Sequence, residues 1–382
     1  AGANVFVKNT LQGVVTDADG QFKLSLNAAN IYEITISFVG YESKTISFIP
    51  PYKDSYSITL SLSNFIADEV VVTATRAGNK MPIAYKNISK EEISRHNMGQ
   101  DVAYLLSLTP SLVQSSESGT GIGYTNFRIR GTDPSRINIT VDGIPLNDAE
   151  SQQVFWVNMP AFASSLNSIQ IQRGVGTSTN GAAAFGATVN MQTESPSKNA
   201  FADITSTFGS YNTFVNTVKA GTGLIKEKMA FDMRYSNMKS DGYVDYAFSD
   251  NQSFQFTGTY YTEKGRIKAN MILGEQHTGI SWWGIDEETL NTNRTYNPAG
   301  QYMTPSGEQR YYENQTDNYW QNHFHLVYST NLSKKLFLNT ALFFVDGKGY
   351  YEQYKQDQGL YDYYLPDIII ENDTITESDL IR

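Results

Sequence analysis

The most informative absence from this sequence is cysteine. None of the 382 residues is a cysteine, which excludes a disulfide framework and any metal or redox site built on thiolates. Long apolar runs are also missing, because no stretch approaches the roughly 18 residues that a membrane-spanning helix needs. A membrane-spanning strand needs only about 9–11 residues with apolar side chains at every second position, so a β-barrel stays open.

Positive charge is scarce as well. The net charge is −10, the sequence pI is about 5.0, and no basic stripe is visible. Without a basic stripe the chain has no surface suited to neutralising a row of phosphates, which argues against a nucleic-acid partner. The four histidines stand in no recognisable metal or nucleophile motif: His96, His277, His323 and His325. We therefore expect no catalytic site, no metal site and no cofactor, and predict that the chain is not an enzyme.

Aromatic residues are plentiful instead. The chain has 25 Tyr and 20 Phe, which favour β-structure and also form the girdles that flank a membrane-spanning barrel. Composition alone leaves an ordinary secreted β-protein and a barrel equally open. No signal peptide precedes the first strand, so we expect the N-terminus to be processed or truncated.

Residues 1–62 are predicted to form a small antiparallel β-sandwich. Asp19-Gly20 is a strong turn signal, and apolar residues alternate with polar ones from Phe22 to Leu26. Further short apolar runs follow before Leu62, at the spacing that a sandwich requires.

Residues 63–80 are predicted to be a linker. It contains an acidic pair and an extended β-branched run: Asp68, Glu69, Val70, Val71, Val72 and Thr73. This run on its own is equally consistent with one more strand. Polar and Gly-containing residues from Arg76 to Lys80 suit a mobile tether.

Residues 81–195 are predicted to form a compact α+β domain. Ser89 precedes an acidic first turn, which predicts the N-cap of a short helix. A second short helix is expected over residues 101–108, ended by Pro110. From Phe127 the pattern changes to strands.

The most specific motifs of the sequence lie in this domain. They are Phe127-Arg128-Ile129-Arg130-Gly131, Ile139-Thr140-Val141-Asp142-Gly143-Ile144-Pro145, and the blocks at 169–181 and 184–193. In this order, over about 65 residues, they resemble the plug domain of TonB-dependent outer-membrane receptors. Two departures are tolerable: Asn180-Gly181 stands where the family more often has Tyr-Gly, and Gly186-Ala187 where it more often has Gly-Gly.

The resemblance extends to the neighbouring segments. Residues 1–62 resemble the carboxypeptidase-regulatory-like domain of Bacteroidetes receptors, on Ala1–Val5, Gly13–Phe22 and Val39-Gly40-Tyr41, with the first strand missing. The run from Asp68 to Thr73 resembles a TonB box, a segment that adds as a strand to the periplasmic protein TonB. The family also implies that three plug arginines meet carboxylates on the barrel wall, although solvated arginines are the alternative: Arg128, Arg130 and Arg173.

Residues 196–382 are predicted to form the first antiparallel strands of a transmembrane β-barrel. Apolar and polar side chains alternate, for example over 229–236 and 267–273, as a water-filled barrel in lipid requires. Short connections alternate with long loops, which are expected near 238–252, 275–321 and from 346 onward. This gives about seven strands of the 22 that a closed barrel of this kind has, so we expect an incomplete portion of a receptor.

The resemblance places the substrate on outward plug loops and outer barrel loops. The candidate residues there are Tyr124, Phe155, Trp156, His277, Trp282, Trp283 and Arg310. Clustered aromatics with arginine suit a bulky, partly anionic ligand, whereas Phe155 and Trp156 could instead pack beneath their loop. Asp286-Glu287-Glu288 is a weaker candidate for Ca²⁺, since adjacent acids on a loop are usually only solvated.

With the resemblance, these features predict TonB-dependent active import of a scarce nutrient across the outer membrane of a Gram-negative bacterium, with the N-terminal domain in the periplasm. The plug motifs lack the Gly-rich form of the family's glycan importers, which favours an iron-siderophore, haem or corrinoid ligand. An oligosaccharide or peptide importer, or a passive surface adhesin, stays open. The expected partners are TonB, outer-membrane lipid and a small nutrient such as a metal chelate, and a surface lipoprotein is a further candidate.

Overall fold

A computed structural model describes most of the chain. The described residues are 2–8, 10, 12–27, 30–38, 44–50, 55–60, 76–78, 81–107, 109–176, 181–262, 265–333 and 336–382. The predicted coupling run from Asp68 to Thr73 lies outside them. The chain divides into two compact units, one of Ala1–Val70 with Tyr261–Arg266 and Ser329–Leu338, the other of Val71–Tyr260, Ile267–Tyr328 and Asn339–Arg382. Within the described ranges, no helix has the length and apolar character needed to cross a membrane.

The N-terminal domain is built on one antiparallel sheet. Its strands are β1 (Asn4–Val7), β2 (Gly13–Val15), β3 (Tyr32–Ser37) and β4 (Lys44–Phe48), in the order β2-β1-β3-β4. Five side chains form its buried core: Val5, Val7, Ile34, Ile36 and Phe48. Alternate side chains of two further extended segments pack on this core: Phe22, Leu24, Leu26, Ile58 and Leu60.

The plug domain is built on a five-stranded mixed sheet. Its strands are β5 (Ala84–Ser89), β10 (Leu166–Arg173), β11 (Ala187–Thr193), β8 (Ile137–Val141) and β9 (Ile144–Pro145), in the order β5-β10-β11-β8-β9. The β11–β8 pair is parallel, whereas the other pairs are antiparallel. The hairpin of β6 (Leu112–Ser116) and β7 (Thr125–Ile129) completes the strands of the domain.

Short helices cover this sheet. Helix α2 (Lys90–His96) begins where the sequence predicted, with the Ser89 hydroxyl accepting a hydrogen bond of 3.3 Å from the Glu92 amide. Helix α3 (Val102–Leu105) is shorter than predicted. Its N-cap residue, Asp101, makes no capping bond because its carboxylate accepts from the Thr125 hydroxyl at 2.9 Å. Three single-turn helices lie in the loops: η1 (Pro134–Arg136), η2 (Trp156–Asn158) and η3 (Phe162–Ser165).

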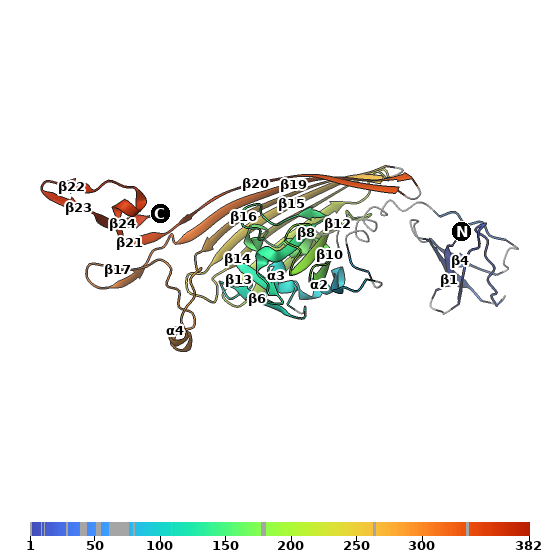
Figure 1. Cartoon of the computed structure of the whole chain (residues 1–382). Helices are drawn as coiled ribbons and strands as arrows, with labels where there is room; N and C mark the ends of the chain where they lie inside the picture. The colour runs from blue at the N-terminus through green and yellow to red at the C-terminus, as the bar shows by residue number, and fades with distance from the viewer. Residues whose placement is uncertain are drawn as a thin grey trace. The chain divides into compact units, whose positions relative to one another are not determined.

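The third part is a seven-stranded antiparallel sheet in sequential order (Figure 1). Its strands are β12 (Ala200–Gly209), β13 (Thr213–Thr222), β14 (Met229–Ser240), β15 (Ser249–Tyr261), β16 (Gly265–Gly279), β19 (Thr316–Ser333) and β20 (Leu336–Glu352). The predicted strand number is therefore confirmed. The elements of the plug lie against one face of this sheet (Figure 1).

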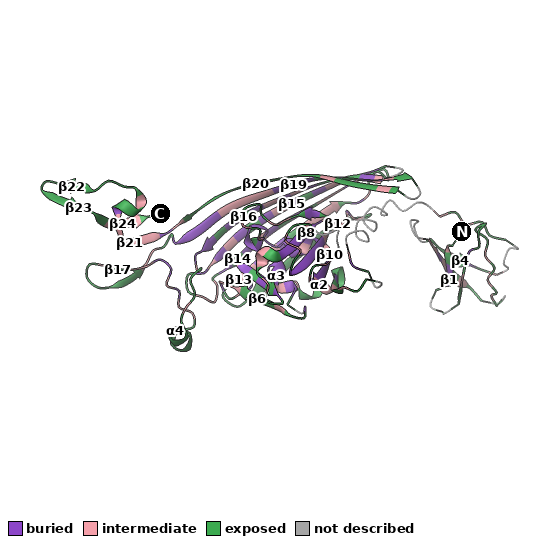
Figure 2. Ribbon diagram, viewed as in Figure 1, coloured by how far each residue is buried: buried purple, intermediate pink, exposed green. Residues whose placement is uncertain are grey.

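The burial of side chains on the two faces of this sheet distinguishes a membrane barrel from a soluble sandwich. On β15 the buried side chains are polar, such as Ser253, Gln255 and Thr257, whereas Phe256 between them is 38% exposed. Figure 2 shows the alternation along the strands. A soluble sandwich buries its apolar face, so polar side chains toward the plug and apolar ones outward fit a barrel in lipid.

Three strands run further than the sequence predicted. Strands β16, β19 and β20 have 15, 18 and 17 residues, more than the roughly 9–11 that cross a bilayer. The expected loop boundaries at 275, 321 and 346 were wrong, because the strands continue past them. Beyond their ends lie helix α4 (Glu287–Thr292) and the single-turn helix η4 (Leu360–Tyr363). Two hairpins are also found there, β17 (Gln301–Met303) with β18 (Gln309–Tyr311) and β22 (Ile368–Ile370) with β23 (Asp373–Ile375), and β21 (Tyr354–Gly359) pairs with β24 (Glu377–Ile381).

Candidate functional site

The chain that follows the predicted coupling run is held firmly by the plug sheet. The Arg76 guanidinium donates to the Ser168 hydroxyl at 3.0 Å, to the Ser168 carbonyl at 3.3 Å and to the Asn190 carbonyl at 3.0 Å. Burial lowers the pKa of Arg76 to about 10, although nearby Asp142 opposes the shift. Arginine carries enough donors in one plane to bind all three acceptors at once.

The next residue is held by a side-chain amide. The Gln170 amide accepts from the Ala77 N–H at 2.7 Å and donates to the Ala77 carbonyl at 3.0 Å. Gln170 thus satisfies both polar groups of one peptide residue, as a neighbouring strand would. Gln170 is 1% exposed and Ala77 5% exposed. We name Arg76, Ala77, Ser168 and Gln170 the coupling anchor.

A spin label beside the coupling anchor tests how firmly it holds. A Cβ added at Gly78 meets no atom within 4 Å, and the chain has no native cysteine, so Gly78→Cys carries a unique label. We expect slow label motion in the parent and fast motion after Arg76→Ala with Gln170→Leu, since each lost bond contributes about 0.5–1.5 kcal/mol. Electron paramagnetic resonance measures the difference. Lys86→Ala, which removes an ion pair on β5, is the control expected to leave the motion unchanged.

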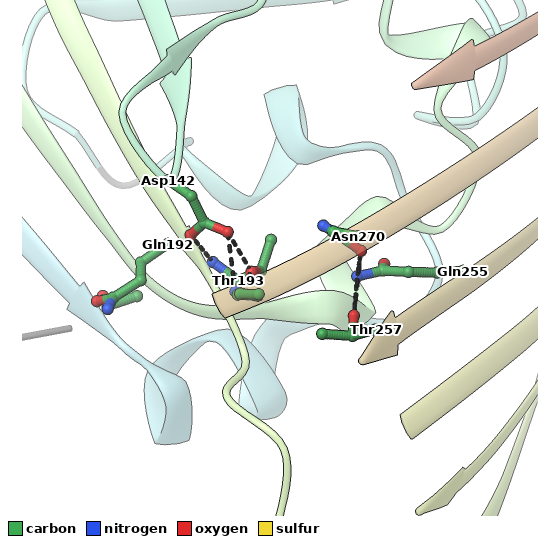
Figure 3. A network of polar contacts seen from close by, with 8 residues as sticks. Asp142, Gln192, Thr193, Gln255, Thr257 and Asn270 are labelled. Carbon is green, nitrogen blue, oxygen red and sulfur yellow. Dashed lines mark hydrogen bonds and ion pairs between the residues drawn. The ribbon is translucent and has the colours of Figure 1, made fainter. Parts of the chain in front are cut away.

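A buried ion pair joins the plug to the barrel wall. Lys268 on β16 donates to Asp142 Oδ2 at 2.9 Å and to the Thr193 hydroxyl at 2.6 Å. Thr193 donates to the two Asp142 oxygens, from its N–H at 2.9 Å and its hydroxyl at 2.6 Å. We name Asp142, Thr193 and Lys268 the wall anchor. Figure 3 shows Asp142 and Thr193, with the wall amides of Gln255 and Asn270 nearby.

The electrostatics of the wall anchor favour a charged carboxylate. Burial raises the pKa of Asp142, but Lys268 and the Thr193 hydrogen bonds lower it more, so the net pKa lies below its ordinary value. Asp142 adopts a φ of +52°, a conformation that aspartate tolerates better than most residues. The sequence indicated only a turn at Asp142-Gly143, although the alternation on β16 already placed Lys268 on its polar face.

Further contacts fasten the C-terminal half of the plug. Glu194 forms ion pairs with Lys219 on β13 at 3.1 Å and with Lys90 at 3.2 Å. Arg234 on β14 donates to the Ala161 carbonyl, and Ser253 on β15 donates to the Pro160 carbonyl at 2.7 Å. The wall therefore also holds the plug through the segments around residues 160 and 194.

The three arginines predicted to meet the wall have plug residues as their described neighbours. Arg128 is exposed on β7, near Asp133. The Arg130 guanidinium lies close to Gly174, and Arg173 donates to the Pro110 carbonyl at 3.5 Å. Within the described ranges, the plug–wall ion pairs are made by Asp142 and Glu194 instead. Wall contacts of the arginines stay a prediction.

One predicted substrate residue, Tyr124, lies at the centre of a polar and aromatic cluster. Its hydroxyl donates to Asp317 at the start of β19, and Gln276 on β16 donates to the same carboxylate at 2.6 Å. The Trp282 ring packs edge-on against Tyr124 with centroids 5.6 Å apart. We name Tyr124, Gln276, Trp282 and Asp317 the outer cluster. Sequence reasoning found Tyr124 and Trp282 but missed Gln276 and Asp317, which carried no motif.

Two plug carboxyls near this cluster have no described cationic partner. Burial raises the pKa of Glu117 to about 7, and one of its oxygens has no hydrogen-bond partner among the described residues. Burial also raises the pKa of Asp101 to about 7, against hydrogen bonds from Thr125 and Gly123. The loop that follows Glu117 reaches the wall at Gly123, whose φ is +92° and whose added Cβ would lie 2.7 Å from the Ser249 hydroxyl.

The other predicted substrate residues are scattered. Trp156 is 2% exposed and packs on Phe127 in the plug core at 6.0 Å, while Phe155 is 42% exposed. His277 bonds Asn318 at 2.6 Å and, being next to Gln276 in the strand, points to the opposite face. Trp283 lies beneath the Lys355 ammonium, which is 5.6 Å from the centre of its ring. Exposed Arg310 forms an ion pair of 2.8 Å with Glu308.

The acidic run at Asp286 has a structural role. The Asp286 carboxylate accepts a hydrogen bond of 2.7 Å from the Thr289 N–H and so caps helix α4. Within the described ranges, no group of three or more histidine, cysteine or acidic side chains is placed to hold a metal ion.

Comparison with known proteins agrees with this architecture. Residues 1–72 match the model of the CarboxypepD_reg-like domain, and residues 78–188 match that of the TonB-dependent receptor plug domain. The chain therefore carries the plug domain of the TonB-dependent receptors, preceded by a CarboxypepD_reg-like domain. TonB-dependent receptors are outer-membrane β-barrel proteins with a periplasmic N-terminal plug and are not enzymes, which places this chain in the outer membrane.

Individual relatives match only part of the chain. It is 30% identical over 153 residues to the TonB-dependent receptor SusC of Bacteroides thetaiotaomicron, covering 38% of this chain and 15% of SusC. It is 25% identical over 179 residues to the vitamin B12 transporter BtuB of Vibrio vulnificus, covering 46% of this chain and 28% of BtuB. The chain therefore spans less than a third of the length of these curated relatives.

Solved structures share the fold. The ferric citrate transporter FecA superposes with a TM-score of 0.56 at 17% identity, over 75% of this chain and 42% of FecA. The ferric preacinetobactin receptor BauA of Acinetobacter baumannii gives 0.56 at 14% identity, over 72% and 39%. At such identities the likeness concerns the fold alone.

Proposed function

We propose that this receptor imports a scarce nutrient across the outer membrane by coupling to TonB. The observation that carries the proposal is the coupling anchor. It joins the chain next to the run from Asp68 to Thr73 to two central strands of the plug, β10 and β11. A pull on that run would therefore act on the plug sheet and not on a loose tail.

The contacts suggest an order of events for import. Ligand would first bind at the outer cluster, where Tyr124 belongs to the plug and Asp317 to the wall. TonB would pair with the run around Val71 as an added strand. Force applied there would reach Arg76 and Ala77 and, through Ser168 and Gln170, act on strand β10 of the plug sheet. Movement of this sheet would have to overcome the wall anchor and the ion pair between Glu194 and Lys219.

A bulky, partly anionic ligand such as an iron-siderophore, haem or corrinoid is the favoured cargo. Cations lie over aromatic rings in the outer region, as Lys355 does over Trp283 and Arg382 over Tyr351. Such pairs can exchange toward an anionic or aromatic ligand. BtuB and FecA, which the chain resembles, are named for vitamin B12 and ferric citrate.

An oligosaccharide is the second candidate, and the outer cluster itself favours it. Asp317, Gln276 and Glu117 offer oxygen and amide groups without a described cation beside them, next to the Tyr124 and Trp282 rings. Acceptors of this kind suit a ligand rich in hydroxyl donors more than an anionic chelate.

Uptake assays with a panel of ligands test the proposal. Cells carrying the receptor should accumulate one of a ferric siderophore, haem, a corrinoid or an oligosaccharide, and a protonophore should stop accumulation but not surface binding. Accumulation that the protonophore leaves unchanged, for every ligand bound, would contradict energised import.

Removal of the Trp282 ring tests the place of binding. We expect Trp282→Ala to weaken ligand binding by roughly tenfold, since an aromatic contact at the centre of a site contributes about 1–2 kcal/mol. Titration calorimetry on the purified receptor measures the change. Tyr361→Ala, at a side chain that is 86% exposed, should leave affinity unchanged, and equal effects of both substitutions would move the site away from the outer cluster.

A further inference from the structure

Two histidines of the barrel wall face the plug. His323 and His325 lie two residues apart on β19, so both point to the same face of the strand. They are 2% and 4% exposed, whereas Phe324 between them is 40% exposed on the outer face. Asp142 and Lys268 of the wall anchor lie close enough to His325 to act on it electrostatically.

Both imidazoles lack hydrogen-bond partners within the described ranges. This holds for both ring nitrogens of each residue. The rings are T-shaped, at 83°, with centroids 6.0 Å apart. A buried polar group left without a partner costs about 1–3 kcal/mol, and native proteins usually satisfy such groups with a side chain, water or an ion.

The chemistry of the pair suits a transition metal. Neutral imidazole binds zinc, copper, iron and nickel, with metal–nitrogen bonds of about 2.0–2.1 Å for zinc. Rotation of the two rings would bring one nitrogen of each within that reach of a single ion. The nearby carboxylate of Asp142 is held by Lys268 at 2.9 Å, so the charge of Lys268 is balanced and the site offers two neutral ligands.

Ligand number and type indicate which ion would bind. Two nitrogens without an available carboxylate do not suit Mg²⁺ or Ca²⁺, which prefer oxygen ligands. Among divalent first-row ions the affinity of nitrogen sites peaks at Cu²⁺. With only two protein ligands, the remaining coordination positions would fall to water or to an incoming chelator, so an ion could arrive and leave.

We propose that His323 and His325 form a two-imidazole site for a transition-metal ion on the plug-facing wall of the barrel, with Cu²⁺ bound most tightly. Its role in transport rests on the proposed import function, because movement of the plug would expose the pair to a passing metal chelate. Binding of the ion does not depend on transport.

Copper titration of the purified, tag-free receptor tests the site. The receptor is refolded in detergent with and without Cu²⁺, so that the ion can enter before the plug closes over the wall. We expect one bound ion whose electron paramagnetic resonance spectrum shows coupling to two nitrogens. His323→Gln and His325→Gln should each weaken binding by more than about tenfold, because loss of even an indirect partner of a metal ligand costs 10–100-fold.

Matched controls separate this site from other binding. His96→Gln with His277→Gln removes the other two histidines of the chain and should leave the signal unchanged. A heat-dependent shift on electrophoresis confirms that each variant has folded. A signal that survives both wall substitutions, or that only the control abolishes, would overturn the site. Failure of energised uptake with intact copper binding would contradict the import function and leave the metal site standing.

Discussion

Val71→Pro abolishes energised uptake while ligand binding at the cell surface is retained. This result is expected because a strand that adds to a partner sheet needs its backbone N–H groups, and proline has none. Val71 stands in the middle of the predicted coupling run. Accumulation and binding of the same radiolabelled ligand, measured on the same cells, show the two effects separately.

A conservative variant makes this experiment decisive. Val71→Ile keeps the N–H and the β-branched side chain, so it should transport as the parent does. If Val71→Pro transports normally, the run does not act as a TonB box. If both variants fail equally, the side chain and not strand pairing matters, which would contradict coupling by strand addition.

Asp142→Ala loosens the plug by about 3–5 kcal/mol, the usual effect of breaking a buried ion pair by removing one partner. The substitution leaves Lys268, whose side chain is 3% exposed, without its carboxylate, and it removes the acceptor of the Thr193 N–H. Hydrogen exchange of the peptide from Ala187 to Thr193 measures the loss. We expect its protection to fall roughly 100- to 5000-fold, at 1.36 kcal/mol for each factor of ten.

A second substitution and a pH series test the cause of this loss. Adding Lys268→Met to Asp142→Ala should restore part of the protection, because no unpaired charge then stays buried. The folded pKa of Asp142 is lowered, so its contribution is fully present above the ordinary value of 3.8 and is lost as pH falls through the folded pKa. The difference in hydrogen-exchange protection between the parent and Asp142→Ala should be constant from pH 5 to 8 and disappear at lower pH. A difference that persists at low pH would show that the substitution acts through packing and not through the ion pair.

The barrel was predictable because lipid and water impose opposite demands on neighbouring residues. On β15, polar Ser253 and Gln255 alternate with Phe254 and Phe256, and that alternation is local. The ends of β16, β19 and β20 were not predictable, because hydrogen bonding between strands continues beyond the bilayer, where the side chains no longer have to alternate strictly.

The contacts that hold the plug were not predictable in the same way. Asp142 and Lys268 are 126 residues apart, and the sequence shows each only as a turn residue and a polar strand residue. Gln170 likewise reads as an ordinary polar position in a strand, although its amide binds Ala77, 93 residues away. Conversely, the plug motifs drew attention to Arg128 and Arg130, whose wall contacts stay a prediction.

Cross-linking to TonB tests the central claim most directly. A cysteine placed at Val72 is unique in this cysteine-free chain and can form a disulfide with a cysteine in the periplasmic domain of TonB. We predict a cross-linked product that increases when the transported ligand is added, and none from a matched cysteine at exposed Asn199. No product at Val72, or equal products at both positions with and without ligand, would contradict TonB-coupled import by this receptor.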